Sequence, residues 1–372
     1  MRAAVRNANA NQRRPFDIRT PGEVRLRRSR CLICYWDAGR LTYHNYLTGT
    51  KINAAPVVTA VLDFFTDWTS PEKLRSAWPD HSWKSISRTL IRLAALSFLE
   101  IEGSEDPRSA AISAWENWSP TAAFFHLSTK DVRYVTDVAL REREIRRRIR
   151  EDPQPSFTKF YSGNPVVPLN RNGLPGKSEF VKVLNARRTW REFSKKPLAL
   201  EDLAKLLDLT WGVRKYLAIR FLGRLPLKTS PSAGARNPIE VYVAALRVKG
   251  LARGLYHYSS EQHDLRLLQP HTNKRQIVRF LGGQYWYGGA AAVFFMTAVF
   301  PRQMWKYRYP RSYRSVLLDA GHLCQTFCLT ATWLGLAPFC TAALADSLIE
   351  KELGIDGITE SVLYAAGVGE QP

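Results

Sequence analysis

Three arginines and a threonine lie close together in a stretch that could bind a phosphate. The stretch reads Ala186-Arg-Arg-Thr-Trp-Arg-Glu-Phe193, so Arg187, Arg188 and Arg191 surround Thr189. Guanidinium groups donate charge-assisted hydrogen bonds to phosphate oxygens, and a threonine hydroxyl adds a neutral donor. A basic surface turn would have the same composition, so the stretch alone leaves both interpretations open.

A second stretch has small residues where a flat ligand could approach the backbone. In Thr229-Ser-Pro-Ser-Ala-Gly-Ala-Arg-Asn-Pro-Ile-Glu240, the residues Ser232, Ala233, Gly234 and Ala235 carry little side chain. Prolines on both sides brace the turn before an expected strand. The stretch has neither the P-loop lysine pattern nor the G-x-G-x-x-G spacing of dinucleotide-binding turns. It favours a loop that lies against a planar group.

Polar residues recur at three-residue steps on one expected helix. Asp319, His322 and Gln325 have the spacing of metal ligands or a proton relay. The same helix carries leucines and cysteines typical of a core helix. We therefore expect a polar face packed against a cofactor or a partner subunit, and no metal.

The chain has five cysteines, too few and too odd in number for a disulfide scaffold. Cys31 and Cys34 have the spacing of half a zinc site or a redox pair, but no second pair of ligands follows nearby. Cys324 and Cys328 lie at helical spacing. This usage indicates small buried hydrophobic residues in a reducing compartment, and we expect a cytoplasmic protein.

The second half of the chain alternates helical and strand patterns. It predicts an α+β domain over residues 178–372, with helices at 200–211, 312–334 and 343–353 and strands at 239–248, 255–258, near 295 and at 361–366. A linker rich in proline and glycine covers residues 151–177. The longest apolar run, 290–300, suits a buried strand and is too short to span a bilayer. No signal peptide is expected, and we predict no membrane association.

The first half predicts a smaller domain over residues 31–150, preceded by a basic arm at 1–30. Three short helices, at 57–65, after Ser70 and at 86–96, come before a strand at 98–102, an order similar to a winged helix-turn-helix. The charged run 141–150 predicts a further, solvated helix with Glu-to-Arg pairing.

The formal net charge of +21 raises the hypothesis of nucleic-acid binding. From residue 315 onward there are seven acidic residues and one lysine, so the excess lies upstream. The helix at 86–96 is flanked by Lys84 and carries Arg88 and Arg92, as a DNA-reading helix would. These three residues fall opposite its apolar stripe, so a solvated face explains them equally well, and nucleic acid is not the favoured partner.

The order and spacing of the motifs along the chain are more specific than any single motif. Together the motifs resemble the nitroreductase-like flavoproteins, and more closely the SagB-type (McbC-like) dehydrogenases that act in thiazole- and oxazole-forming peptide maturation. The likeness covers nearly the whole chain after about residue 25. It is carried by residues 118–131, 187–193, 231–238, Gly254-Leu-Tyr-His-Tyr258, Trp305-Lys-Tyr-Arg308, 313–322 with Gln325, and 334–337.

The resemblance implies a nitroreductase-like α+β FMN-binding fold, with the winged-helix-like domain in front, and usually a homodimer with the flavin between subunits. Arg187, Thr189 and Arg191, beside Arg188, would hold the phosphate or ribityl chain, and Ser232–Ala235 would lie against the flavin. Leu334-Gly-Leu-Ala337 would precede a short loop, and residues 336–341, including Ala337, Phe339 and Cys340, would pass near the other side of the flavin. Many nitroreductases add a basic pair after the final strand, and this sequence shows none in Gly367-Val-Gly-Glu-Gln-Pro372. Either the first arginine cluster suffices for the phosphate, or Arg236 substitutes.

Lys306 and Tyr307 fall on the Lys-Tyr pair that azoline dehydrogenases of this family use catalytically. Aromatising an azoline ring requires loss of a Cα proton and departure of a hydride from Cβ, so a base must lie on one side of the ring and an electron acceptor on the other. Arg302, Arg308, Arg311 and Arg314 surround the lysine with no acid between them in sequence, which would favour its free amine. Tyr307 would orient the amine or stabilise developing negative charge.

The favoured function is therefore FMN-dependent oxidation of thiazoline or oxazoline rings in a ribosomally made peptide, with oxygen as final acceptor and a cyclodehydratase as a further partner. One alternative keeps the flavin and makes the protein an NAD(P)H-dependent nitro or quinone reductase, or another natural-product oxidase. An alternative of another class is a nucleic-acid-binding protein that acts through its basic N-terminal domain.

Overall fold

The computed structural model describes residues 24–152, 156–157, 168–169, 178–220 and 222–372. Most of the expected basic arm (1–30) and linker (151–177) lies outside these residues. The chain divides into two compact units, Met1–Ser128 and Thr129–Pro372. The boundary therefore lies earlier than residue 150, where the sequence pattern placed it.

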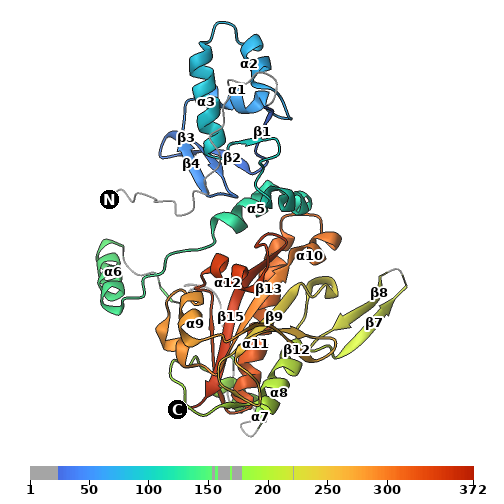
Figure 1. Ribbon diagram of the computed structural model, residues 1–372. Helices are drawn as coiled ribbons and strands as arrows, with labels where there is room; N and C mark the ends of the chain where they lie inside the picture. The colour runs from blue at the N-terminus through green and yellow to red at the C-terminus, as the bar shows by residue number, and fades with distance from the viewer. Residues whose placement is uncertain (1–23, 153–155, 158–167, 170–177, 221) are drawn as a thin grey trace. The chain divides into compact units, whose positions relative to one another are not determined.

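In the first unit, three helices pack on a small apolar core, as predicted (Figure 1). They are α1 (Val57–Phe64), α2 (Pro71–Ala77) and α3 (Trp83–Ala95), followed by α4 (Arg108–Ala111), the 3₁₀ helix η1 (Ile112–Trp118) and α5 (Ser119–Ser128). Leu62, Leu90 and Phe98 are among the buried residues of this core. Lys84, Arg88 and Arg92 are exposed, as the solvated-face interpretation predicts.

The strands of the first unit were only partly foreseen. The predicted strand after α3 is β5 (Leu99–Ile101), which pairs antiparallel with β1 (Leu26–Arg28). An antiparallel sheet of β2 (Leu32–Asp37), β3 (Arg40–Asn45) and β4 (Thr50–Asn53) precedes the helices and was not predicted. Ala38 and Gly39 both have positive φ in the β2–β3 turn, which is typical of a tight hairpin. Cys31 is buried as expected, whereas Cys34 is exposed on β2.

The second unit is built on a six-stranded antiparallel sheet with the order β12-β11-β9-β13-β15-β14. Its strands are β9 (Ile239–Ala245), β11 (Gly254–Ser259), β12 (Asp264–Pro270), β13 (Ala292–Val299), β14 (Leu336–Thr341) and β15 (Glu360–Glu370). The short strands β6 (Leu198–Ala199) and β10 (Val248–Lys249) pair in parallel. A hairpin of β7 (Lys215–Ile219) and β8 (Gly223–Leu227), which the sequence did not predict, projects from this unit (Figure 1).

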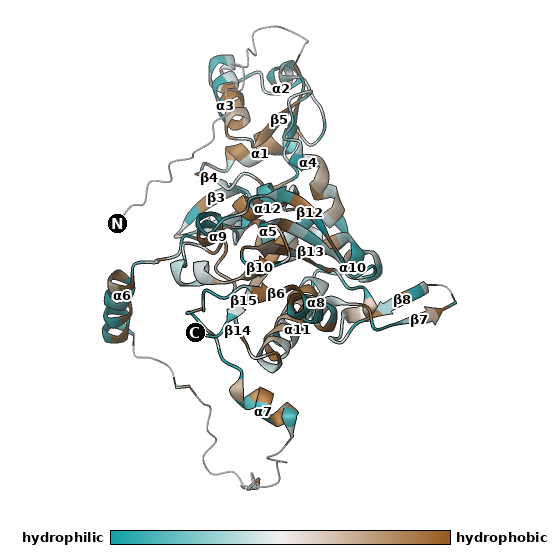
Figure 2. Cartoon of the chain, turned by 60° about the horizontal axis from the view of Figure 1, so that its bottom comes forward, coloured by the Kyte–Doolittle hydropathy of each residue, from teal (hydrophilic) through white to brown (hydrophobic). Residues whose placement is uncertain are grey.

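Helices cover both faces of this sheet because successive side chains of β13 point to opposite sides. Phe294 stacks on Trp211 and meets Phe327, while Phe295 faces the other way toward Phe280. Figure 2 shows brown, apolar residues along α11 and the central strands. The helices are α7 (Glu179–Ala186), α8 (Leu200–Trp211), α9 (Lys274–Phe280), α10 (Phe300–Lys306), α11 (Ser312–Trp333), α12 (Asp346–Leu353) and the 3₁₀ helices η2 (Ala233–Ala235) and η3 (Tyr285–Gly289).

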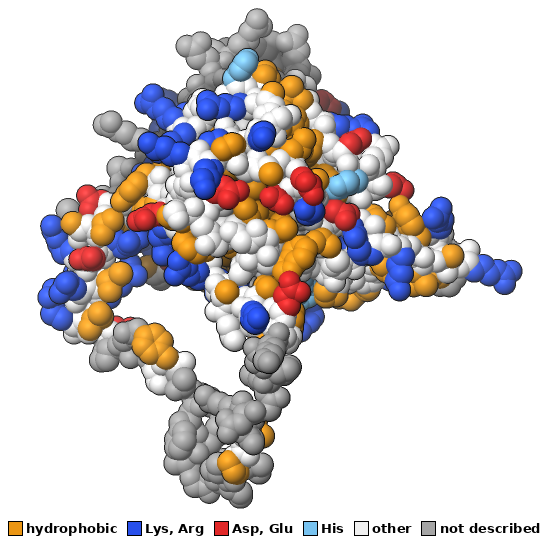
Figure 3. Space-filling model, turned by 90° about the horizontal axis from the view of Figure 1, so that it is seen from below, with side chains coloured by type: hydrophobic (Ala, Val, Ile, Leu, Met, Phe, Trp, Pro, Cys, Tyr) orange, Lys and Arg blue, Asp and Glu red, His pale blue; other side chains and the backbone are white. Residues whose placement is uncertain are grey.

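Two surface elements of the second unit are rich in basic side chains. The predicted solvated helix is α6 (Val138–Glu151), which buries none of its side chains and in which Arg147 pairs with Glu144 and Glu151. Figure 3 shows basic side chains over α6 and over the β7–β8 hairpin. In the part of the chain that the structure describes, no helix is both long and apolar enough to cross a membrane.

The short loop expected after Ala337 is instead part of the edge strand β14, which pairs with β15 along its whole length. β15 also extends further than the predicted strand. Gly367 of β15 lies opposite Phe339 in this pairing, and the Phe339 ring stacks on Tyr287 with centroids 3.8 Å apart. Small residues at the end of β15 thus make room for aromatic side chains. Because small residues such as glycine are not typical of strands, the sequence pattern did not predict this part of β15.

Replacing Gly367 with alanine is expected to destabilise the fold. The added Cβ would overlap the Phe339 ring and lie 3.2 Å from the Ala292 carbonyl oxygen, which costs about 1–3 kcal/mol for overpacking. Gly321→Ala is the matched control, because open space surrounds Gly321 on α11. It should be stabilising by about 0.5–1 kcal/mol. Urea unfolding of both variants checks this, and equal shifts would contradict the packing.

Candidate functional site

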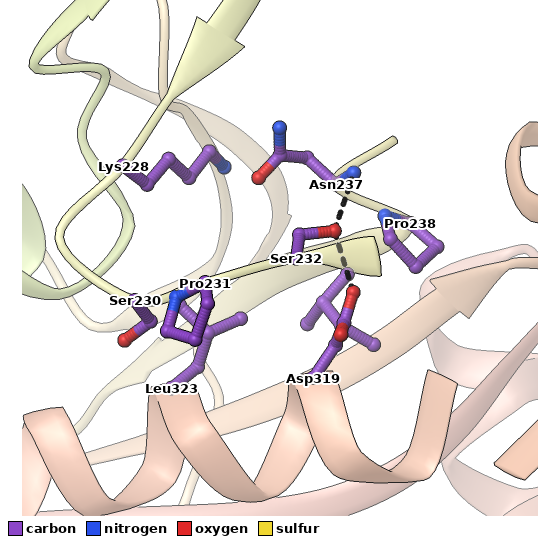
Figure 4. A pocket seen from close by; sticks show the side chains of 9 residues that line it. Lys228, Ser230, Pro231, Ser232, Asn237, Pro238, Asp319 and Leu323 are labelled. Atoms are coloured by element: carbon purple, nitrogen blue, oxygen red, sulfur yellow. Dashed lines mark hydrogen bonds between the residues drawn. The ribbon is translucent and has the colours of Figure 1, made fainter. Parts of the chain in front are cut away.

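The loop Pro231–Pro238 adopts a strained backbone at the position where the sequence predicts close approach of a flat ligand. Gly234, Ala235 and Asn237 have φ values of 63°, 53° and 45°, and such left-handed conformations cost of order 1–3 kcal/mol for residues other than glycine. The loop is held from both sides. Ser232 Oγ donates to Asp319 Oδ2 at 2.6 Å, and the Asn237 backbone N–H donates to Ser232 Oγ at 2.9 Å (Figure 4).

Asp319 ties this loop to α11. The residue is only 4% exposed, and burial raises the pKa of its carboxyl, partly offset by the hydrogen bond from Ser232. His322 and Gln325 are exposed on the same helix. Among the described residues they do not join Asp319 in a cluster that could hold a metal. His322 acts on Asp319 electrostatically, and Asp319 itself anchors the loop.

Lys306 and Tyr307 meet the same loop from α10. A Cβ placed on Gly234 would lie 2.7 Å from Lys306 Nζ and closer still to the Tyr307 hydroxyl. The amine and the hydroxyl therefore converge on the Gly234 backbone, although the two stretches are far apart in sequence. A side chain at this position would require the amine and the hydroxyl to move away. The structure thus joins two of the predicted clusters.

The charges around Lys306 differ from the sequence expectation. Arg302 forms an ion pair with Glu240 of β9, so an acid from a distant strand balances one of the surrounding arginines. His257 of β11 donates to the same carboxylate at 3.0 Å. Burial alone would raise the pKa of Glu240, but the bond to His257 and the charge of Arg302 outweigh it and lower that pKa. Arg236 lies over the Trp305 ring at 4.7 Å.

A cavity of about 410 Å³ opens beside this network, on the side of the β7–β8 hairpin. Lys228, Arg236, Glu240, His257 and Arg302 are among the residues that line it. Burial, with a contribution from Arg302, lowers the pKa of Lys228 to about 8, although Glu240 opposes the shift. Lys228 also lines a pocket of about 10 Å³ with Ser232, Asn237 and Asp319 (Figure 4), which is room for about one water. The sequence gave no signal for Lys228.

The arginine stretch lies at a second place, where α7 ends and β14 begins. Arg187 is the C-cap residue of α7, and the Trp190 backbone N–H donates to the Pro338 carbonyl oxygen at 2.9 Å. Arg188 stacks its guanidinium 3.8 Å over the Trp190 ring. Thr189 and Arg191 are exposed, so their polar groups are accessible to a ligand.

The three β14 residues predicted to approach a cofactor differ in exposure. Ala337 and Phe339 are fully buried in the core, whereas Cys340 is partly accessible. The strand pairing explains this, because Phe339 faces the Tyr287 stack and Cys340, one residue on, faces the other side. Of the three, only Cys340 offers surface in a single chain.

Residues 184–370, just over half of the chain, match the model described as Nitroreductase family. The chain belongs to the nitroreductase family. It therefore has the nitroreductase-like α+β fold predicted from sequence, and it is an oxidoreductase of a family with flavin-dependent members. The likeness at residues 118–131 lies upstream of the matched range and stays a prediction.

Two relatives with different names are similar to this chain. Putative nitroreductase MJ1384 of Methanocaldococcus jannaschii is 33% identical over 174 residues, 46% of this chain and 83% of that protein. Trifolitoxin-processing protein TfxB of Rhizobium leguminosarum bv. trifolii is 32% identical over 172 residues, 45% of this chain. The match covers 46% of TfxB, less than half of its length.

One solved structure similar to this chain is a chain of the E. coli microcin synthetase McbBCD complex with truncated pro-MccB17 bound. It is 21% identical, with a TM-score of 0.49, and the match covers 70% of this chain and 97% of that one.

Gly234→Ala is expected to push Lys306 and Tyr307 away from the loop. Gly335→Ala is its matched control, because Gly335 has a similar φ of 72° but open space around it. Both variants incur backbone strain of about 1 kcal/mol, and only Gly234→Ala adds the steric clash. Thermal unfolding should show the larger loss for Gly234→Ala. Equal losses would mean that the lysine and tyrosine do not pack on this backbone.

Lys228→Met is expected to stabilise the protein at neutral pH. The amine has a pKa of about 8 in the folded chain against 10.5 when unfolded, so below pH 8 the folded chain holds a poorly solvated charge that costs about 1–3 kcal/mol. Between pH 8 and 10.5 the unfolded chain binds the additional proton, so parental stability rises and the advantage of the variant fades.

Urea unfolding from pH 7 to 10.5 measures this difference, with the exposed Lys215→Met of the same hairpin as control. An advantage for Lys228→Met that stays constant with pH would contradict the assignment.

Proposed function

We propose that the chain is an FMN-dependent dehydrogenase that oxidises thiazoline or oxazoline rings in a ribosomally made peptide to thiazoles or oxazoles. The observation that carries the proposal is the convergence of Lys306 and Tyr307 on the Gly234 backbone. An amine and a phenol beside a loop of small residues provide a base and a hydrogen-bond donor next to a surface that suits a planar ring.

The residues present fit FMN at both ends of the expected cofactor. The half-buried Arg187 and the exposed Arg188, Thr189 and Arg191 would hold its phosphate and ribityl chain. The loop Ser232–Arg236, whose left-handed Gly234 leaves no room for a side chain, would lie against the flavin ring. FMN supplies an acceptor for hydride at its N5 atom. Cys340 is the β14 residue with surface left for contact.

Lys306 has the central task in this reaction. Its amine would take the Cα proton of the azoline ring, and bound FMN would accept the Cβ hydride, so that the ring would lose two hydrogens and gain a double bond. The Tyr307 hydroxyl orients the amine or donates to the oxygen on which negative charge develops. The Glu240–Arg302 pair fixes the start of α10 and so holds Lys306 in place. Oxygen is the expected final electron acceptor.

The name of one relative supports the substrate class. TfxB, which is 32% identical to this chain over 172 residues, is called a trifolitoxin-processing protein. We infer a modified precursor peptide as substrate and a cyclodehydratase as the partner that forms the azolines. The winged-helix-like first unit would bind the peptide or that partner.

A homodimer belongs to the same proposal. α11 exposes Leu317 and Leu318, at 42% and 61%, on the surface beside Gly321. An apolar stripe on the helix that anchors the Ser232 loop is suited to pack against a second copy near the site.

The second candidate is an NAD(P)H-dependent nitro or quinone reductase, favoured by the similarity to a protein named as a nitroreductase. It uses the same cofactor site but needs no base, so Lys306 separates the two reactions.

Lys306→Ala should lower azoline oxidation by about 10²–10⁴-fold, the usual contribution of a general base, and should leave FMN content unchanged. The assay follows a synthetic thiazoline peptide by mass spectrometry, with the exposed Lys351→Ala on α12 as control. Oxidation at the parental rate in Lys306→Ala would remove the base assignment. A parental protein that stays colourless after incubation with FMN would overturn the proposed function as a whole.

A further inference from the structure

Three thiols from two elements meet inside the second unit. The sulfur atoms of Cys324, Cys328 and Cys340 all lie within 4.8 Å of one another. We propose that they bind one thiophilic d¹⁰ cation, Zn²⁺ or Cu⁺, between α11 and β14. The sequence pattern predicted small buried hydrophobic residues for the first two and did not place the third beside them.

The fold brings these side chains together for clear local reasons. Cys324 and Cys328 are four residues apart on α11, so both project from one face of the helix. Gly335, with a positive φ, ends the connection from α11 and lets β14 turn back along it. On β14 the alternation of side chains sends Phe339 toward Tyr287 and leaves Cys340 on the α11 side.

The spacing suits a metal with sulfur ligands. A Zn–S bond of about 2.3 Å in tetrahedral geometry sets the sulfurs about 3.8 Å apart, and a trigonal Cu⁺ site of similar bond length sets them about 4.0 Å apart. The sulfur atoms lie at most 4.8 Å apart, so each sulfur–sulfur distance needs to shorten by about 1 Å or less to reach these values. Thiolates select Zn²⁺ and Cu⁺ over harder cations.

The surroundings narrow the choice of ligand further. In the ranges that the structure describes, no imidazole or carboxylate joins the three sulfurs. An all-sulfur set of three completes a trigonal Cu⁺ site, whereas Zn²⁺ would keep a fourth position for water. Cys324 and Cys328 are buried and Cys340 is partly exposed, so an ion has a path of entry past Cys340. Each thiol releases its proton to solvent when it binds.

An isolated buried cysteine looks different. Cys31 is fully buried in the first unit, and no other cysteine, histidine or carboxylate of the described residues forms a ligand cluster with it. The meeting of three sulfurs therefore goes beyond what cysteines as small apolar residues require. Because the ligands lie on α11 and β14, a bound ion would join the central helix to the edge strand.

Cobalt titration of the reduced, chelator-treated full chain tests the proposal under anaerobic conditions. We expect one Co²⁺ per chain and a thiolate-to-cobalt charge-transfer band, displaced by Zn²⁺ or Cu⁺ added in separate arms. Both ions are expected to displace cobalt. The ion that the protein retains in the presence of a chelator is the preferred metal. The bound ion should also raise the midpoint of thermal unfolding.

Cys340→Ser and Cys324→Ser/Cys340→Ser should weaken binding by more than about tenfold and abolish the band, whereas Cys34→Ser, which removes an exposed thiol of the first unit, should keep both. Circular dichroism checks that each variant is folded. Because Cys340 is partly exposed, its replacement by serine should disturb the core least. A folded parental chain without the band at excess cobalt would overturn the site. So would a band that survives in the double variant.

Discussion

The hydrogen bond from Ser232 to Asp319 is the constraint on which the candidate site depends. It fastens a loop with three left-handed residues to the buried side of α11. Without a fixed anchor, that loop would relax toward ordinary backbone angles, and Gly234 would leave the position where Lys306 and Tyr307 meet it. The buried carboxyl and the strained loop thus stabilise each other, and the stiffness of the site follows from their pairing.

α11 is also the element that relates the two predicted cofactor regions. Near one end it holds the Ser232 loop through Asp319, and further along it packs against β14, which receives the backbone bond from Trp190. The sheet supplies Glu240, which pairs with Arg302 near the start of α10, and His257, which hydrogen-bonds to Glu240. A polar network on the strands and a core helix therefore position residues that are distant in sequence.

The sequence was sufficient for elements with strong periodicity and for contiguous motifs. It predicted α8, α11 and β13 closely. It also selected the small-residue loop and the Lys306–Tyr307 pair as candidate site residues, and the structure brings these two together. It failed where tertiary contacts decide the structure. β14 and the end of β15 contain many small residues and show no clear alternation of polar and apolar residues. The β7–β8 hairpin buries few side chains, so it lacks a strand pattern as well. The partners Asp319 for Ser232 and Glu240 for Arg302 come from other elements, so spacing along the chain could not pair them, nor could it bring Cys340 to Cys324 and Cys328.

The most direct test of the central claim is anaerobic mixing of the FMN-loaded protein with a thiazoline-bearing peptide while the flavin absorbance is recorded. The account predicts that the oxidised flavin band bleaches without any added NAD(P)H, and that one thiazole forms for each flavin reduced. A band that the peptide leaves unchanged but that NADPH bleaches would contradict ring oxidation and identify the protein as a reductase.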